Sequence, residues 1–391
     1  MGKNRFHFFI SGEEKEVLPG SELWELPLSG KRTGIDGNSQ SGTVNRDAEI
    51  TVGDYFSASC EVLSKDEFSI LSTGLEAIFQ KPVERIDIQK VSVFLEKHGA
   101  FYHPLKIKTE LKNSQTCVFV LNGAVSNPGL SLIETEYSLI LRLNKTFPKR
   151  YLPCVFGLDM LETKYGRAGF FLGEWFENYK EFHVTSGRDQ NQIVIWESDG
   201  ACLYLPEKVA LPIYREAARI LTYYYNIETF EQIYPWRHAA GDFVVKQEGS
   251  QFHVRLITVR GYSVLTEFGS GEADNKNYIL PSLLVFFFNL TIKMRLDRLD
   301  GTGKDVMLGD EVIKATIRGF LEALDEKSKG YDYGDLKLSF ISFIEGWGLE
   351  QITNILATIM ESSDMNPAEK QLMMENIDTH CRIIHTFFKT L

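Results

Sequence analysis

The alternation of hydrophobic and polar residues from 87 to 176 predicts a small sheet with one helix inserted into it. Strict alternation, typical of half-buried strands, is clearest at Ile88, Val91, Val93 and Leu95. Apolar spacings of three and four residues then predict the helix. The expected strands cover residues 87–96, 105–111, 117–125, 151–158 and 168–176, and the helix covers 131–143. The predicted order is three strands, one helix and two strands.

After residue 179 the pattern becomes mainly helical. The expected helices cover residues 205–225, 281–299, 310–327, 349–361 and 367–389. The last has a clear start, because Asn366 is a good cap, Pro367 suits the first turn and Glu369 completes a capping box. Two strand pairs interrupt the helices, one at 192–205 and one at 243–260.

Residues 1–86 show little periodicity, and their Gly-, Ser- and Asn-rich middle at 28–45 predicts a loop or arm. One helix is expected there, at 65–79. We therefore predict an α+β chain in three parts: an N-terminal extension (1–86), a sheet-rich lobe (87–178) and a mainly helical lobe (179–391).

Composition narrows the class of protein. The formal net charge of -11 argues against a nucleic-acid binder, which needs a basic surface, and against docking on an anionic membrane. The five cysteines are scattered and show no metal-binding spacing, which fits a reducing compartment. Residues 1–10 do not form a signal peptide, and the apolar run 283–292 is too short to span a bilayer. We expect a cytoplasmic protein.

The most informative segment is 234–245, Tyr-Pro-Trp-Arg-His-Ala-Ala-Gly-Asp-Phe-Val-Val, which places Arg237, His238 and Asp242 before a strand. With the order of elements, this segment resembles the two-lobed protein-kinase-like fold, and in detail its aminoglycoside-phosphotransferase branch, over about residues 87–324. The resemblance implies a small antiparallel sheet lobe, a larger helical lobe, and a nucleotide or small phosphorylated ligand in the cleft between them. ATP and Mg²⁺ are the cofactors it implies.

The resemblance also assigns cofactor-binding roles in the sheet-rich lobe. The turn that contains His98 and Gly99 matches the glycine-rich loop over the phosphates, with one glycine fewer and two unexpected histidines. Asn122 falls at or near the strand position of the phosphate-binding Lys, and an Asn carries no positive charge.

Two carboxylates complete that set. Glu136 matches the helix Glu that pairs with the missing Lys, and Glu134 is nearly as good a match. Glu174 lies in the segment 171–176, Phe-Leu-Gly-Glu-Trp-Phe, which resembles the hinge that binds an adenine ring through main-chain groups.

In the helical lobe the resemblance permits two alignments. If Gly241 and Asp242 match the segment around the conserved Asn, Asp242 is the metal ligand and Arg237 occupies the catalytic Asp position. If 238–242 is a stretched His-Gly-Asp, Asp242 is the base and the Asn is missing. The next strand offers Thr258 where a metal-binding Asp is expected. His238 and Asp242 are thus the catalytic candidates on both alignments.

Neighbouring charges have two interpretations. Arg237, Arg255 and Arg260 are suited to clamp a phosphate or carboxylate, or to form ion pairs with acidic residues. At the end of the helix expected at 281–299, a run of alternating charges suggests either a salt-bridge network facing the cleft or a solvated helix end. The residues of that run are Arg295, Asp297, Arg298 and Asp300.

On either alignment the site lacks a Lys and one carboxylate, although phosphoryl transfer depends on metal ions held between carboxylates and the nucleotide. The sequence predicts a kinase-like protein that binds a nucleotide or small phosphorylated ligand, with altered or absent phosphoryl transfer. The alternative is a pseudoenzyme scaffold that binds a protein partner. A third class, unrelated chemistry, would need His98, His103 and His238 to meet in space.

Overall fold

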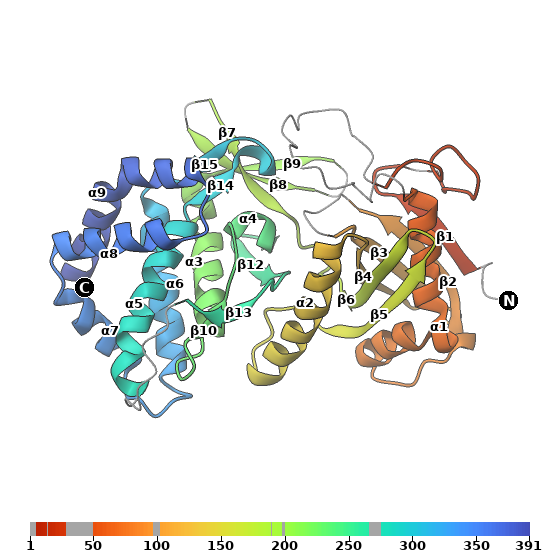
Figure 1. Ribbon diagram of the computed structural model, residues 1–391, viewed down its shortest axis with the longest axis horizontal. Coiled ribbons are helices and arrows are strands. Elements are labelled where there is room, and N and C mark those ends of the chain that lie inside the picture. Colours follow the sequence, from red (N-terminus) through yellow and green to blue (C-terminus); the bar gives the residue numbers. More distant parts are fainter. Residues whose placement is uncertain are drawn as a thin grey trace. The chain divides into compact units, whose positions relative to one another are not determined.

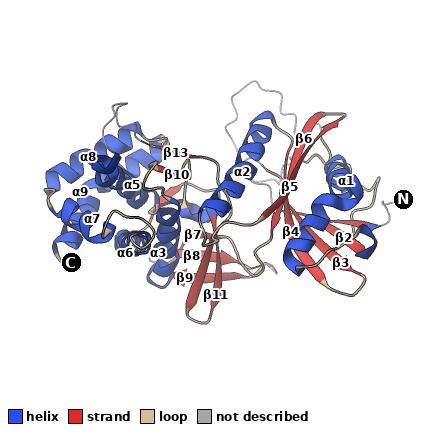
Figure 2. Ribbon diagram, turned by 90° about the horizontal axis from the view of Figure 1, so that it is seen from below, coloured by secondary structure: helices blue, strands red, loops and turns tan. Residues whose placement is uncertain are grey.

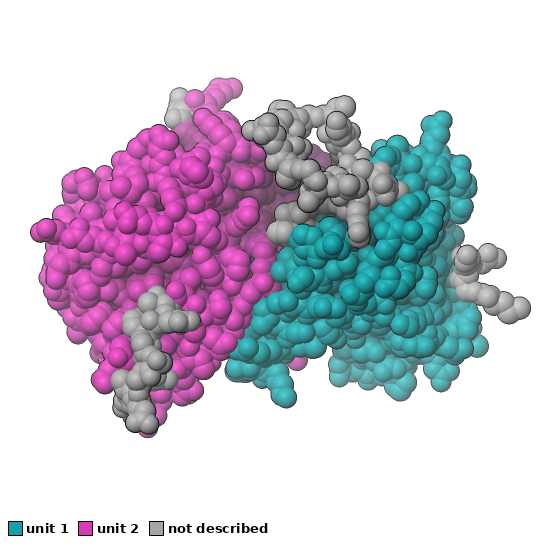
Figure 3. All heavy atoms as spheres, viewed as in Figure 1, with its two compact units in different colours: residues 1–148, 153–177 teal, residues 149–152, 178–391 magenta. Residues whose placement is uncertain are grey.

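The computed structural model describes residues 5–13, 15–28, 50–96, 102–188, 190–197, 200–265 and 275–391. His98 and Gly99 therefore lie outside the described residues. The chain forms two compact units, and Figure 3 colours them separately. Unit 1 comprises residues 1–148 and 153–177, and unit 2 comprises 149–152 and 178–391.

Unit 1 is built on a six-stranded sheet in the order β1-β2-β3-β4-β6-β5 (Figure 1). The strands are β1 (Phe6–Ile10), β2 (Ile88–Leu95), β3 (Leu105–Leu111), β4 (Thr116–Ala124), β5 (Val155–Thr163) and β6 (Gly166–Glu174). Helix α2 (Asn127–Thr146) lies between β4 and β5 in the chain. The predicted order of three strands, one helix and two strands is confirmed, and all neighbours from β2 to β5 are antiparallel.

Two helices cover opposite faces of this sheet, because successive residues of a strand point to opposite sides. Helix α1 (Val52–Phe79) packs on the face of Phe170, whose ring centroid lies 5.3 Å from that of Tyr55. Helix α2 packs on the face of Phe171, whose ring lies 6.1 Å from that of Tyr137. The core of unit 1 therefore lies on both sides of β4 and β6.

Residues 1–86 differ from the predicted extension, because they contribute β1 and α1 to unit 1. Strand β1 pairs in parallel with β2, so it adds an edge strand that is remote in sequence. Helix α1 begins at a capping box between Thr51 and Asp54 and contains a non-helical kink at residues 65–68. The kink interrupts the helical period, which explains why only the part after it was predicted.

Among its described residues, unit 2 contains four small sheets. A three-stranded antiparallel sheet consists of β7 (Phe182–Ser186), β8 (Asn191–Trp196) and β9 (Cys202–Pro206). The two-stranded pairs are β11 (Phe243–Glu248) with β12 (Gln251–Leu256), β10 (Glu231–Ile233) with β13 (Tyr262–Val264), and β14 (Leu296–Arg298) with β15 (Asp305–Met307). Both predicted strand pairs are present, as β8 with β9 and β11 with β12.

Helices make up most of unit 2, and α5 to α9 lie together in Figure 2. They are α3 (Glu207–Tyr224), the single turn α4 (Ala239–Asp242), α5 (Ile279–Lys293), α6 (Glu311–Lys327), α7 (Leu336–Glu345), α8 (Leu349–Ser362) and α9 (Pro367–Lys389). The rings of four phenylalanines join α5, α6, α7 and α9, with centroids 4.8 to 5.7 Å apart in four of the pairs: Phe287, Phe320, Phe340 and Phe388. The α+β fold class, with a sheet-rich unit and a mainly helical one, is confirmed.

Two features of the helical part differ from the prediction. Helix α5 ends at Lys293, and residues 296–298 form β14, although the helix was expected to continue to residue 299. Helix α7 was not predicted. Of the helices in the described ranges, none is both long and apolar enough to cross a membrane.

The start of α9 supplies a first testable prediction. The Asn366 side chain accepts hydrogen bonds from the Ala368 and Glu369 N–H groups at 2.9 and 3.0 Å, and the Glu369 carboxylate accepts from the Asn366 N–H at 2.9 Å. We expect Asn366→Ala to lower the free energy of unfolding by about 1 kcal/mol, the usual cost of losing a cap. Chemical denaturation measures it. Asn354→Ala, at an exposed position inside α8, is the control and should change stability by less than about 0.5 kcal/mol.

Candidate functional site

The segment 234–245 is held on short structural elements of unit 2. Trp236 is buried, His238 is the residue before the single turn α4, and Asp242 is the last residue of that turn. Gly241 has a φ of +83°, a left-handed conformation that favours glycine. The turn therefore fixes His238 and Asp242 at its two ends, immediately before β11.

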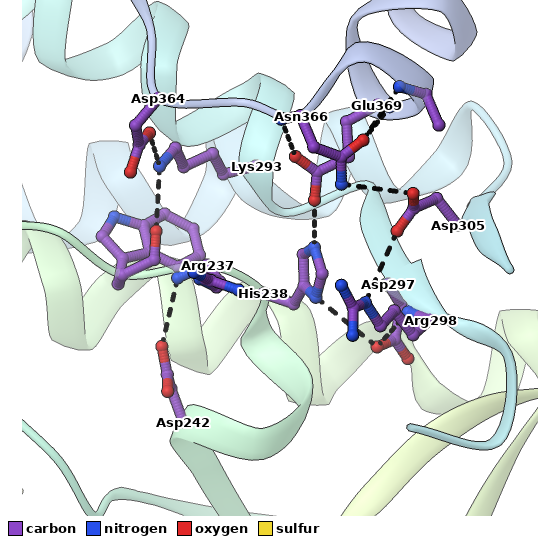
Figure 4. Close-up of polar contacts among 12 residues, drawn as sticks. Arg237, His238, Asp242, Lys293, Asp297, Arg298, Asp305, Asp364, Asn366 and Glu369 are labelled. Carbon is purple, nitrogen blue, oxygen red and sulfur yellow. Dashed lines mark hydrogen bonds and ion pairs between the residues drawn. The ribbon is translucent and has the colours of Figure 1, made fainter. Parts of the chain in front are cut away.

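Asp242 is buried, and both of its carboxylate oxygens are already bound. Arg260 donates through Nη1 to Oδ2 at 3.0 Å and through Nη2 to Oδ1 at 2.6 Å. The Arg237 backbone N–H donates to Oδ2 at 3.2 Å (Figure 4). A two-pronged pair between arginine and a carboxylate is among the strongest polar contacts in proteins. Of the two interpretations of Arg260, the structure shows the ion pair.

Thr258 lies between two residues that contact Asp242. The N–H of the preceding residue, Ile257, donates to the Asp242 backbone carbonyl at 2.9 Å, and Arg260 follows two residues later. Asp242 and Arg260 are therefore in contact, and Thr258 lies near Arg260 in the chain. The metal-ligand position that the resemblance assigns to residue 258 holds a hydroxyl instead of a carboxylate, and its role stays a prediction.

His238 is buried in a row of alternating histidines and carboxylates. Its Nε2 lies 2.7 Å from Glu369 Oε1, and its Nδ1 lies 4.0 Å from Asp297 Oδ1. Asp297 is buried as well, with His183 Nδ1 at 3.4 Å from the same oxygen. His238 is thus placed between carboxylates from β14 and α9 (Figure 4), and not beside Asp242 in a catalytic pair.

The other contacts of this row fix its geometry. Asp297 accepts hydrogen bonds at 2.7 Å from the backbone N–H groups of Val184 and Arg298. For Glu369, burial acts to raise the pKa, but hydrogen bonds from His238 and from the Asn366 backbone outweigh it and lower the pKa. Glu369 is therefore stabilised in the ionised form by donors that the fold supplies.

An ion pair between a buried lysine and an exposed aspartate lies beside this row. Lys293 is buried and donates through Nζ to the Trp236 carbonyl at 2.9 Å and to Asp364 Oδ1 at 2.8 Å. Burial acts to raise the pKa of Asp364, but the hydrogen bond and the charge of Lys293, together with a hydrogen bond from Tyr234, outweigh burial and lower the pKa. Neither Lys293, at the end of α5, nor Asp364, before α9, was singled out from the sequence. Only their position within the folded unit reveals them.

The charged run after α5 does not form the network that was considered. Arg295 binds Asp310 Oδ1 at 2.9 Å and lies 3.2 Å from His380 Nδ1, both outside the run. Arg298 Nε lies 3.7 Å from Asp305 Oδ1. The physical reason is that these residues lie on a strand and turn, which separates side chains that a helix would have placed on one face.

Three of the cofactor-binding candidates lie in unit 1. Asn122 is half-buried on β4, opposite Phe171 of β6. Glu136 is buried on α2, with 1% of its surface exposed. Glu174 ends β6 and accepts a hydrogen bond from the Cys154 N–H at 3.1 Å. Their expected contacts with a cofactor remain predictions.

Metal binding at this site also remains a prediction. Across the described ranges, no group of three His, Cys, Asp or Glu side chains is arranged to hold a metal ion. At Asp242 itself, a cation would have to displace the Arg260 guanidinium or share the carboxylate with it.

Comparisons with known proteins give likenesses among solved structures. The sequence matches no family model and no curated protein. Among solved structures, the chain is similar to the Drosophila melanogaster PAN3 pseudokinase, with 8% sequence identity and a TM-score of 0.29. The match covers 79% of this chain and 70% of that one. The fold class stated above rests on the strands and helices themselves.

Proposed function

We propose that the protein is a kinase-like pseudoenzyme that acts by binding and does not transfer phosphoryl groups. The observation that carries the proposal is the bidentate ion pair between Arg260 and Asp242. Asp242 is the residue to which both sequence alignments give an essential role, as metal ligand or as base. A carboxylate with both oxygens held by a guanidinium is available for neither role.

The energetic cost of binding Mg²⁺ at Asp242 supports a permanent ion pair between Arg260 and Asp242. Binding Mg²⁺ at Asp242 would displace Arg260 or place two cations beside one carboxylate. The Arg260 side chain is 23% exposed, so it would lose its counterion in a setting that water screens only in part. Mg²⁺ also gives up its water ligands reluctantly and is normally held by carboxylates plus nucleotide phosphates. Thr258 and Asn122 supply neither the second carboxylate nor the lysine.

The proposed ligand is a nucleotide such as ATP or a small phosphorylated molecule, bound without a requirement for Mg²⁺. The proposed location is the cytoplasm, in line with the scattered free cysteines. A protein partner is the second candidate. It is favoured by large apolar side chains that α7, α8 and α9 expose to solvent, namely Leu338 (60% exposed), Leu349 (37%) and Met374 (53%).

A phosphoryl-transfer assay tests the proposal. With the full chain, ATP and Mg²⁺, we expect neither ATP hydrolysis nor transfer to protein or small-molecule acceptors above the rate without protein. Thermal-shift measurements with ATP should give the same change with Mg²⁺ and with EDTA. Magnesium-dependent turnover that disappears in Asp242→Asn, but persists in the control Asp332→Asn at an exposed position, would refute the proposal.

A further inference from the structure

A cavity of about 110 Å³ lies within unit 2, beside the row of histidines and carboxylates. It is surrounded by the residues just before α4, the end of α5, strand β14 and the start of α9. Its lining residues are Arg237, His238, Lys293, Leu296, Arg298, Asp364, Met365, Asn366 and Glu369. Figure 4 shows most of these side chains converging on one region.

The acidic side chains of this lining already accept hydrogen bonds from neighbouring donors. Asp364 is bound by Lys293 at 2.8 Å. Glu369 has one oxygen against His238 at 2.7 Å and the other against the Asn366 N–H at 2.9 Å. Each carboxylate is therefore engaged by donors within the fold, which reduces its repulsion of an anion in the cavity.

The two arginines of the lining, in contrast, have donors to spare. Within the ranges that the structure describes, no hydrogen bond or ion pair reaches the Arg237 guanidinium, and only the backbone N–H of that residue binds Asp242. The Arg298 side chain is 45% exposed, and its ion-pair contact, to Asp305, is long at 3.7 Å. Two guanidinium groups with unused N–H donors thus face one small cavity.

The other charges around the cavity also favour binding of an anion. Three cationic side chains, Arg237, Lys293 and Arg298, line the cavity against two carboxylates, so its lining has an excess of positive charge even when His238 is neutral. Helix α9 directs its positive end to the same place, because Asn366 and Glu369 of its first turn line the cavity. This cationic site lies in a chain whose formal net charge is -11.

We propose that this cavity binds the phosphate group of a phosphomonoester or free phosphate, held by forked hydrogen bonds from Arg237 and Arg298. Guanidinium groups match the geometry of phosphate oxygens and bind them in pairs of hydrogen bonds. The volume is well below the roughly 300 Å³ at which pockets begin to enclose a drug-sized ligand. The phosphate is therefore enclosed while the rest of the ligand stays outside, which disfavours recognition of a nucleotide base here.

This inference deepens the proposed function by naming the chemical group that is bound, and it rests on that proposal only for the ligand class. The experiment is isothermal titration calorimetry of the full chain at constant ionic strength with inorganic phosphate, phenyl phosphate and benzoate. We expect saturable binding of one or both phosphate compounds and much weaker binding of benzoate, which carries a single charge. Preference for phenyl phosphate identifies a phosphomonoester site, and equal or better binding of inorganic phosphate identifies a free-phosphate site.

Single variants assign the site to the two arginines. Arg237→Gln and Arg298→Gln should each weaken phosphate binding about tenfold or more, the loss expected from one charge-assisted hydrogen bond. Arg318→Gln, at an exposed position on α6, is the matched control and should leave affinity unchanged. Unchanged thermal midpoints of the variants show that they are folded.

Absence of saturable binding, equal affinity for benzoate, or binding that survives both substitutions would overturn the phosphate site. These failures are separate from failure of the proposed function. Phosphate binding together with magnesium-dependent phosphoryl transfer would retain the site and refute the pseudoenzyme. If the protein neither binds phosphate nor transfers phosphoryl groups, the phosphate site is refuted and the pseudoenzyme proposal is retained.

Discussion

Replacing Asp242 with alanine is expected to lower the free energy of unfolding by about 3 kcal/mol. Removing one partner of a buried ion pair typically costs 3–5 kcal/mol, because the remaining charge loses its counterion. The lower end applies because the Arg260 side chain is 23% exposed and water screens part of its charge. The substitution also leaves the Arg237 backbone N–H without its acceptor. Urea denaturation followed by circular dichroism measures the effect.

A double-mutant cycle with Arg260→Ala separates the pair from its surroundings. The double variant should be less destabilised than the sum of the two single variants, since neither charge is then left alone. Asp332→Ala, at an exposed position in the segment before α7, is the control and should have little effect. A loss below about 1 kcal/mol for Asp242→Ala would mean that Asp242 is not held by Arg260. The proposed absence of phosphoryl transfer would then lose its main support.

The stability prediction also bears on how the segment 234–245 is understood. Catalytic carboxylates are usually kept at some cost to stability, so their removal often leaves a protein as stable or more stable. Asp242 should behave in the opposite way. A large loss of stability on its removal would identify it as a structural counterion, at a position to which the resemblance gives a role as metal ligand or base.

Much of the fold could be predicted because local patterns and final structure agree. The alternation at Ile88, Val91 and Val93 reflects a strand with one buried face, and these three side chains are fully buried in β2. Helix α9 was predicted with its observed bounds, because Asn366 and Glu369 form a capping box that depends on neighbouring residues alone.

The predictions of secondary structure were wrong where an element depends on residues that are remote in the sequence. Strand β1 is stabilised by pairing with β2, about 80 residues later in the chain, and its five residues alone are too short to be convincing. Similarly, residues 294–298 continue a helical charge pattern, yet Leu296 to Arg298 pair with β15. In both cases tertiary pairing overrides the local pattern.

In the candidate site, too, neighbouring residues could be identified from the sequence and remote partners could not. The sequence identified Arg237, His238 and Asp242 as a charged group, and it considered ion pairing for Arg260. It gave no means of choosing Glu369 as the partner of His238, because the two residues are 131 positions apart. The signal available for Glu369 was its capping role, and the structure shows that one carboxylate serves both the cap and the histidine.

The second large effect is expected at Lys327, at the end of α6. Its side chain is buried, and Nζ donates to the carbonyl oxygens of Tyr223 and Tyr225 at 2.7 and 2.6 Å. These carbonyls lie at the end of α3, where helix acceptors have no partner within the helix. Burial lowers the pKa of Lys327 to about 7, from an ordinary value of 10.5. The folded protein therefore holds this proton less tightly than the unfolded chain.

The direction of the pH dependence follows from that difference. Between pH 7 and 10.5 the unfolded chain binds more of the Lys327 proton than the folded protein, so the contribution of Lys327 to stability rises with pH over this window. From pH 7 to pH 9 the rise is about 2 kcal/mol, at 1.36 kcal/mol per pKa unit. Lys327→Met removes the titrating group. The stability of the wild-type protein relative to this variant should therefore increase by about 2 kcal/mol over the same interval.

Denaturant titrations of both proteins at pH 7, 8 and 9 measure this change, and taking the difference cancels the groups that titrate alike in each. Lys329→Met is the matched control, because Lys329 is 75% exposed two residues away and should show no such trend. Parallel stability curves for the wild-type protein and Lys327→Met would show that the proton on Lys327 is held equally in both states. The amine would then remain a charged donor to the end of α3 throughout this pH range, and its two short hydrogen bonds would outweigh the cost of burial.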